Sequence, residues 1–255
     1  MYSLKEYLSE ALVKHKISNY RNEDDVVDFG LSVKWLKYNL AGDKLTDDES
    51  DYGYYYQWGS TIGYPDATKH KFTWQTTPYC SGSSTSLAKY VTKPSYGTVD
   101  NKTILEPMDD AVTTLLGSEY RMPTVDEYVE LYKHCTGSSD RKSIVTGSLS
   151  GTTSVSSKGT YWVNNGTTVD GVKYVNAGCL FVGQDITKRI FFPASGHCNY
   201  SSVYHVDSCG CYWASSLNSS YSIDGYILYF KSSYVYPSYY DYRHNGFSIR
   251  GVKVK

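Results

Sequence analysis

Residues 124–137 read Thr124-Val125-Asp126-Glu127-Tyr128-Val129-Glu130-Leu131-Tyr132-Lys133-His134-Cys135-Thr136-Gly137. Thr124 followed three residues later by Glu127 forms a capping box, which is typical of the first turn of a helix. Apolar side chains then recur at helical spacing, at Tyr128, Leu131 and Tyr132. Because Gly137 is a typical residue just beyond a helix end, the stretch predicts an amphipathic helix from 124 to 137.

A second helix is expected just before it, over residues 106–117. Glu106-Pro107-Met108-Asp109-Asp110 places a proline in the first turn and acidic residues at the positive end of the helix dipole. Gly117 is the expected end of this helix.

Strand signals lie on both sides of the two helices. Upstream they cover 28–35 and the aromatic run 54–59. Downstream the β-type runs are 161–163, 172–175, 179–182, 189–192, 211–213, 226–230 and 247–250. A chain with strands, two helices and then more strands predicts an α+β fold with antiparallel sheets. Residues 138–158, rich in Ser, Thr and Gly, are expected to form an exposed loop or hairpin.

The first 25 residues are expected to form a separate unit. Residues 3–15 carry a capping box and an apolar stripe, and the polar segment 18–25 follows them as a linker. The stripe could pack on the domain at 26–255, or it could be a docking helix that attaches the protein to a scaffold. No signal peptide is recognised, so the protein is expected to be made in the cytoplasm.

Composition argues against several classes of protein. The 255 residues contain 25 Lys and Arg against 26 Asp and Glu, so a nucleic-acid partner is not expected. No apolar run is long enough for membrane insertion. Nucleotide-binding and hydrolase motifs are missing, and no histidine has metal-ligand spacing. We therefore expect no catalytic residue, cofactor or metal, and free thiols at all six cysteines.

Tyrosine is the unusual feature, with 28 residues in the chain and eleven of them between His197 and Arg250. Tyr212 and Tyr229, beside Trp213 and Phe230, are expected in the core. The stretch 237–242 carries too many rings to bury, so several must face water. Exposed tyrosines supply stiff, amphipathic contact area, which predicts a binding surface rather than a catalytic site.

Several motifs, in this order along the chain, resemble the Fibrobacter succinogenes major paralogous domain family, which is abundant in Bacteroidetes and their phages. The resemblance covers residues 26–252. It rests on the segments 28–35, 52–59, 105–111, 120–124, 192–196, 212–216 and 246–250. It implies a C-type lectin-like fold similar to that of the formylglycine-generating enzyme.

Residues 197–250 further resemble the variable region of proteins diversified by retroelements, in which adenine-directed mutagenesis rewrites codons on a C-type lectin scaffold. Fixed pieces alternate there with residues whose codons derive from an asparagine codon by changes at adenine. The resemblance implies rewritten positions at His197, Cys198, Tyr200, Ser202, Tyr204, His205, Asp207, Cys209, Cys211, Tyr221, Ser222, Asp224, Tyr226, Tyr234, Tyr236, Tyr239, Tyr240, Asp241, Tyr242 and His244. All of these except Cys198 are the predicted ligand-binding residues.

The function implied is attachment of a phage to a glycan or protein receptor on the bacterial surface. The protein would then reside in the virion and be held there through residues 3–15. A homo-oligomer is also a possible arrangement. Two alternatives stay open: an oxidase of the formylglycine-generating type, and a bacterial adhesion module without diversification.

Overall fold

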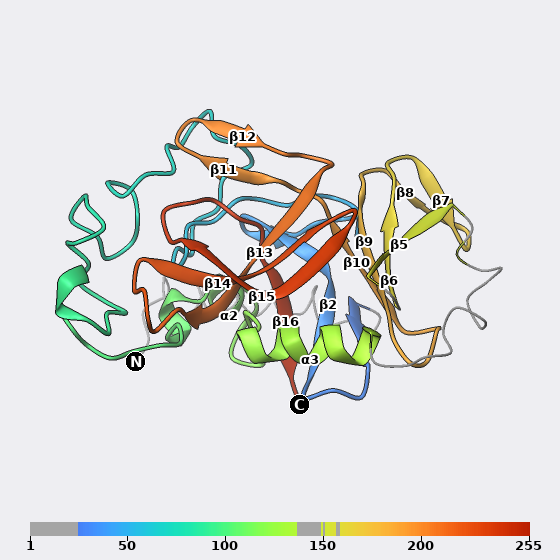
Figure 1. Cartoon of the computed structure of the whole chain (residues 1–255), viewed down its shortest axis with the longest axis horizontal. Helices are drawn as coiled ribbons and strands as arrows, with labels where there is room; N and C mark the ends of the chain where they lie inside the picture. The colour runs from blue at the N-terminus through green and yellow to red at the C-terminus, as the bar shows by residue number, and fades with distance from the viewer. Residues whose placement is uncertain (1–24, 137–148, 150, 157–158) are drawn as a thin grey trace, which may run out of the picture.

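Two strands from opposite ends of the domain lie side by side in the largest sheet. The computed structural model describes residues 25–136, 149, 151–156 and 159–255, and the expected docking helix at 3–15 lies outside them. Strand β2 (Val33–Ala41) pairs with β16 (Arg250–Val254), with Trp35 opposite Val252. The sheet is completed by β1 (Val26–Val27), β3 (Lys44–Leu45) and β4 (Tyr120–Arg121). Figure 1 shows β2 and β16 running together through the middle of the molecule.

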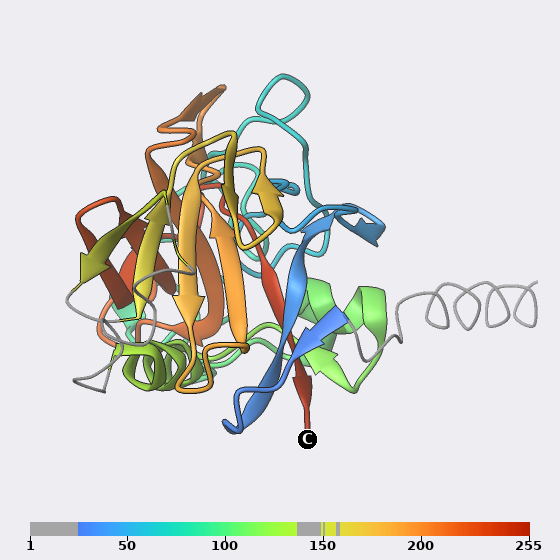
Figure 2. The same ribbon diagram turned by 90° about the vertical axis from the view of Figure 1, so that its right-hand side faces the viewer.

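The remaining strands of the described residues form four smaller sheets (Figures 1 and 2). Two of them come from the middle of the chain. One contains β5 (Thr152–Ser156), β6 (Thr160–Val163), β9 (Gly178–Val182) and β10 (Arg189–Pro193). The other pairs β7 (Thr167–Val169) with β8 (Val172–Tyr174). The other two cover the C-terminal part: β11 (His197–Asn199) with β12 (Ser202–Tyr204), and β13 (Cys209–Leu217), β14 (Asp224–Lys231) and β15 (Tyr234–Tyr242). All these named strands pair in antiparallel fashion, which confirms the predicted α+β class with antiparallel sheets.

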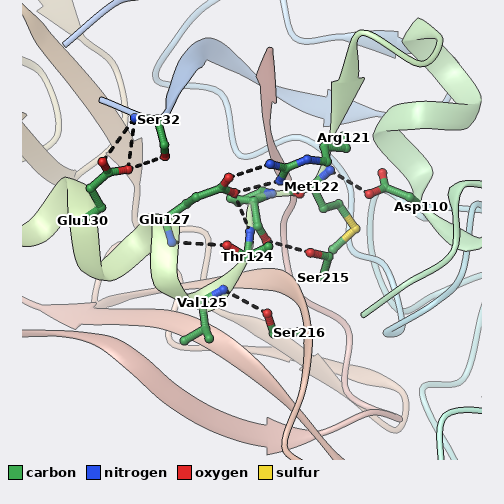
Figure 3. Close-up of polar contacts among 11 residues, drawn as sticks. Ser32, Asp110, Arg121, Met122, Thr124, Val125, Glu127, Glu130, Ser215 and Ser216 are labelled. Atoms are coloured by element: carbon green, nitrogen blue, oxygen red, sulfur yellow. Dashed lines mark hydrogen bonds and ion pairs between the residues drawn. The ribbon is translucent and has the colours of Figure 1, made fainter. Parts of the chain in front are cut away.

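Helix α3 (Val125–Thr136) confirms the capping box. The Glu127 amide donates to Thr124 Oγ1 at 3.3 Å, and the Thr124 amide donates to Glu127 Oε2 at 2.8 Å (Figure 3). Arg121 pairs with the same carboxylate, so the first turn is tied to β4. The helix packs on β13, β14 and β15 and buries Tyr128 and Leu131 in the core.

Four segments differ from the sequence prediction. In the stretch 28–35 the strand begins only at Val33, the first residue of β2. The helix expected at 106–117 is divided into a 3₁₀ turn (Pro107–Asp109) and α2 (Ala111–Leu116), because the Asp110 carboxylate caps α2 by accepting from Val112 and Thr113 amides.

The aromatic run 54–59 does not form a strand. Tyr55 makes one isolated bridge to Tyr64, and Tyr56 makes one to Phe247.

The fourth difference lies at the C-terminal end. The strand expected at 247–250 begins only at Arg250, and the preceding residues make isolated bridges instead.

Strand β13 separates two hydrophobic cores and is buried along its whole length. Tyr212 and Ala214 point into the core beneath α3, whereas Cys209, Cys211 and Trp213 point into the core beside α2. The strand therefore fixes the position of everything built on β14 and β15. In the described part of the chain, no helix has the length and apolar character needed to cross a membrane.

Candidate ligand-binding face

Seven tyrosine rings form a continuous strip on β14, β15 and the turn before them. The strip consists of Tyr221, Tyr226, Tyr229, Tyr234, Tyr236, Tyr239 and Tyr240. Neighbouring ring centroids lie between 4.8 Å (Tyr234 to Tyr236) and 6.5 Å (Tyr229 to Tyr236). These separations are those of stacked, tilted or edge-to-face aromatic pairs, so each ring supports the next.

Pairing between β14 and β15 brings these rings together. Tyr226 lies opposite Tyr240, and Tyr229 lies opposite Tyr236, and each opposed pair shares a face of the sheet. The two pairs lie on different faces, because Tyr226 packs against the core beneath α3 and Tyr229 against the core beside α2. The register shifts between Ile227 and Tyr229. A bulge of this kind bends an edge strand and re-aims its side chains, and Tyr239 and Tyr240 are both exposed although they are adjacent in sequence.

A lysine stands at each end of the tyrosine strip. The Lys93 ammonium lies 5.7 Å from the Tyr221 ring centroid, and the Lys231 ammonium lies 5.9 Å from that of Tyr229. Both distances are within the range of a cation–π contact. The strip therefore offers uncharged phenol faces between two positive ends.

A hollow of about 310 Å³ lies among a second group of rings. Its lining comprises Trp74, Ser84, Asn199, Tyr200, Ile223, Tyr242 and His244. The His244 ring lies 4.7 Å from Trp74 and is stacked on Tyr242 at 5.5 Å. Burial lowers the pKa of His244 to about 4, so the hollow is lined by a neutral imidazole near pH 7.

Arg243 holds the turn between β13 and β14 in place from inside the protein. Its guanidinium is buried and lies 4.7 Å from the Trp58 ring centroid, while Nη1 donates to the carbonyl oxygens of Ser222 and Tyr90. Burial lowers the pKa of Arg243 to about 10, which still leaves the side chain charged at neutral pH. A fixed cation beneath the turn between β13 and β14 restricts how far this part of the face can move.

The predicted residues fall into three groups by exposure. Nine are exposed: Tyr200, Ser202, Tyr204, His205, Tyr221, Tyr236, Tyr239, Tyr240 and Tyr242. Five are half-buried: His197, Asp207, Tyr226, Tyr234 and Asp241. The other five are buried: Cys209, Cys211, Ser222, Asp224 and His244. Several tyrosines thus face water, as the sequence predicts.

Four of the buried residues lie beneath the surface instead of on it. Cys209 and Cys211 point into the core beside α2, and Asp224 is covered at the start of β14. Ser222 accepts from the Thr92 amide at 2.9 Å, which anchors the loop 91–93. The half-buried Asp207 is also engaged, because its Oδ1 accepts from the Tyr52 hydroxyl and the Ala177 amide.

Two aromatic residues of the face are missing from the sequence prediction. Tyr229, expected in the core, is only half-buried and contacts three other rings of the strip. Trp74 comes from a long segment without named strands, more than a hundred residues before the other rings. Its only sequence signal was a lone tryptophan among polar residues.

His197, Cys209 and Cys211 meet at one point, and their ligand atoms lie within 4.8 Å of one another. Hydrogen bonds from Cys211 and from His197 lower the pKa of the Cys209 thiol, whereas the Cys209 sulfur and burial raise the pKa of Cys211. Spacing along the sequence did not predict this cluster, because His197 is twelve residues from Cys209.

Comparison with known proteins gives one match. The model of a family described as Domain of unknown function (DUF8237) matches residues 157–252. No curated protein and no solved structure matches the chain. The matched segment spans the described strands from β6 through most of β16, and it contains every predicted ligand-binding residue.

Proposed function

We propose that this protein binds a receptor through the tyrosine strip and the adjacent hollow. The observation that carries the proposal is the continuous run of mutually supported rings with exposed faces on an edge strand. Tyrosine loses little rotamer entropy when it is covered and offers both apolar area and a hydroxyl, so a preformed strip can bind without reordering. Clusters of exposed apolar area on a protein surface commonly mark interaction sites.

We further propose that the scaffold is a C-type lectin-like fold and that the face is diversified. What supports this is the resemblance of the ordered motifs to the Fibrobacter succinogenes major paralogous domain family and to retroelement-diversified proteins. Most of the positions that the resemblance marks as rewritten are exposed or half-buried on β11, β12, β14, β15 and their turns. The proposed biological setting is attachment of a phage virion to the bacterial surface.

The proposed ligand is a surface glycan or a protein receptor. Uncharged rings stack on the apolar faces of sugars and also cover apolar protein surface. Two lysines, Lys93 and Lys231, contact rings of the strip. Few charges would therefore meet the receptor, and the affinity should depend weakly on salt.

A binding screen with the full chain tests the proposal. The expected result is a hit among bacterial surface glycans or surface proteins that persists at high salt. The proposal would be overturned if the protein bound to whole cells of none of the bacteria whose phages carry this gene. Two further measurements test the setting: mass spectrometry of purified virions should detect the polypeptide, and the genome should hold a template repeat that differs from codons 197–250 only at adenines.

A further inference from the structure

Two cysteines on one strand and a histidine on another meet beside the tyrosine strip. Cys209 lies opposite Lys231 and Cys211 lies opposite Tyr229 in the pairing of β13 with β14. Opposed residues share one face of a sheet, so both thiols project from the face that carries the Tyr229 end of the strip. His197, at the start of β11, supplies the third side chain.

Gly210 fixes the direction of both thiols. A Cβ on Gly210 would lie 2.0 Å from the Phe230 ring, so that ring occupies the opposite face of the strand. Because side chains alternate along a strand, Cys209 and Cys211 both point away from Phe230 and toward the same side.

Gly196 places the histidine. Its amide donates to the Cys209 carbonyl at 2.8 Å, and its φ is +66°. A Cβ there would lie 2.0 Å from the Tyr204 carbonyl oxygen, so only glycine allows this close crossing of the two chain segments. The His197 ring is then held between Tyr204, at 5.5 Å, and the edge of Phe247, at 6.0 Å.

The geometry suits a cation better than a disulfide. Alternate residues of an extended strand have Cα atoms about 6.7 Å apart, at the upper limit of the separation that a disulfide spans. The three ligand atoms, all within 4.8 Å of one another, lie near the separations in a tetrahedral zinc site. Bonds of about 2.0–2.3 Å place such donors roughly 3.3–3.8 Å apart, so small side-chain rotations would close the set.

We propose that His197, Cys209 and Cys211 form a Zn²⁺ site at the edge of the tyrosine strip. Two thiolates and an imidazole are donors that Zn²⁺ prefers, and three protein donors leave one position of a tetrahedral ion for an outside donor. The site goes beyond receptor binding by the rings, and it can be tested without knowing the receptor.

The test uses the full chain, reduced and metal-free, titrated with Co²⁺ as a spectroscopic probe. The expected result is a thiolate-to-cobalt absorption band that saturates at one Co²⁺ per chain and disappears when Zn²⁺ is added. Cys211→Ser should abolish the band. His197→Phe keeps a ring between Tyr204 and Phe247 but removes the donor, and it should weaken the band or shift its position. Cys80→Ser, which changes a cysteine outside the cluster, should leave the band unchanged.

A second measurement uses only the wild-type protein, so its result does not depend on whether a variant folds. It compares the reactivity of the thiols with and without Zn²⁺. Zn²⁺ should slow the reaction of two thiols with a disulfide reagent. Absence of the cobalt band and of protection in the wild-type chain would overturn the proposal. An unchanged band in His197→Phe would also overturn it, because the site would then need only the two sulfurs.

Discussion

Asn39 and Arg250 are joined by a buried hydrogen bond, from Arg250 Nε to Asn39 Oδ1 at 2.7 Å, across 211 residues of sequence. The guanidinium also donates to the carbonyl oxygens of Leu36 and Phe191, at 3.2 and 3.0 Å, and lies 4.9 Å from the Phe192 ring centroid. One side chain thus ties β2, β10 and β16 together.

Arg250→Leu should therefore lower the free energy of unfolding by about 3–5 kcal/mol, because it leaves buried acceptors without a donor. Chemical denaturation measures the loss. Arg189→Leu is the matched control, since Arg189 pairs with Asp170 at a partly exposed site and should cost less than about 1 kcal/mol. Equal losses in the two variants would contradict the structural role of Arg250.

Tyr239 and Tyr240 are the exposed centre of the tyrosine strip, with 46% and 45% of their surface accessible. Replacing both with alanine should abolish receptor binding, because it interrupts the strip, and should change stability by less than about 1 kcal/mol. Binding to bacterial cells and thermal unfolding measure the two effects. A large drop in melting temperature would show instead that these rings hold the fold together.

Two double variants serve as controls for that result. Tyr239→Phe with Tyr240→Phe keeps the stacked rings and should retain part of the binding. Val172→Ala with Val175→Ala removes two exposed apolar side chains outside the sheet that carries the strip and should leave binding unchanged. Loss of binding in the second control would mean that the interface lies elsewhere.

Two tryptophans should separate stability from recognition. Trp213 is fully buried, donates from Nε1 to the Tyr56 carbonyl at 2.7 Å and packs 4.4 Å from the Phe247 ring. Trp213→Ala should cost about 3–5 kcal/mol of unfolding free energy. Trp74→Ala should cost clearly less but should weaken binding, because Trp74 lines the hollow beside His244. The reverse ranking in denaturation experiments would contradict this assignment.

The sequence predicts those parts of the fold in which local chemistry decides the structure. The capping box at Thr124 and Glu127 is satisfied within one turn of α3, and the short β-type runs between residues 160 and 231 form strands. The aromatic run at 54–59 has the same composition but forms no strand. Its residues make single bridges, one to the nearby Tyr64 and one to the distant Phe247, and isolated bridges of this kind leave no strand-like pattern in the sequence.

The candidate site could be predicted only in part for a similar reason. Exposure of the tyrosines follows from their density, since so short a stretch cannot cover all its rings. Burial of β13 on both sides cannot be inferred from the sequence, because its two faces pack against different hydrophobic cores. Cys209 and Cys211 are buried for that reason. Trp74 and His197 join their clusters through tertiary crossings, such as the one at Gly196, which sequence spacing does not encode.

Asp224 should make stability depend on pH. Burial, together with the nearby Asp241 carboxylate, raises the pKa of Asp224 from its ordinary 3.8 to about 6. Because the folded pKa lies above the unfolded one, the protonated side chain contributes stability below about pH 4, and this contribution is lost as the pH rises through 6. Asp224→Asn keeps the shape without the charge and should be more stable than wild type at about pH 7.5, by roughly 1–3 kcal/mol.

Urea denaturation at several pH values measures this difference, which should shrink toward zero near pH 4. Asp185 is a control of opposite sign, since hydrogen bonds from Thr187 lower its pKa. Asp185→Asn should therefore lose stability at neutral pH, and its difference from wild type should diminish as the pH falls. If Asp224→Asn gains no stability at neutral pH, other groups in the folded protein must stabilise the charged carboxylate. Its burial would then not lower the free energy of unfolding.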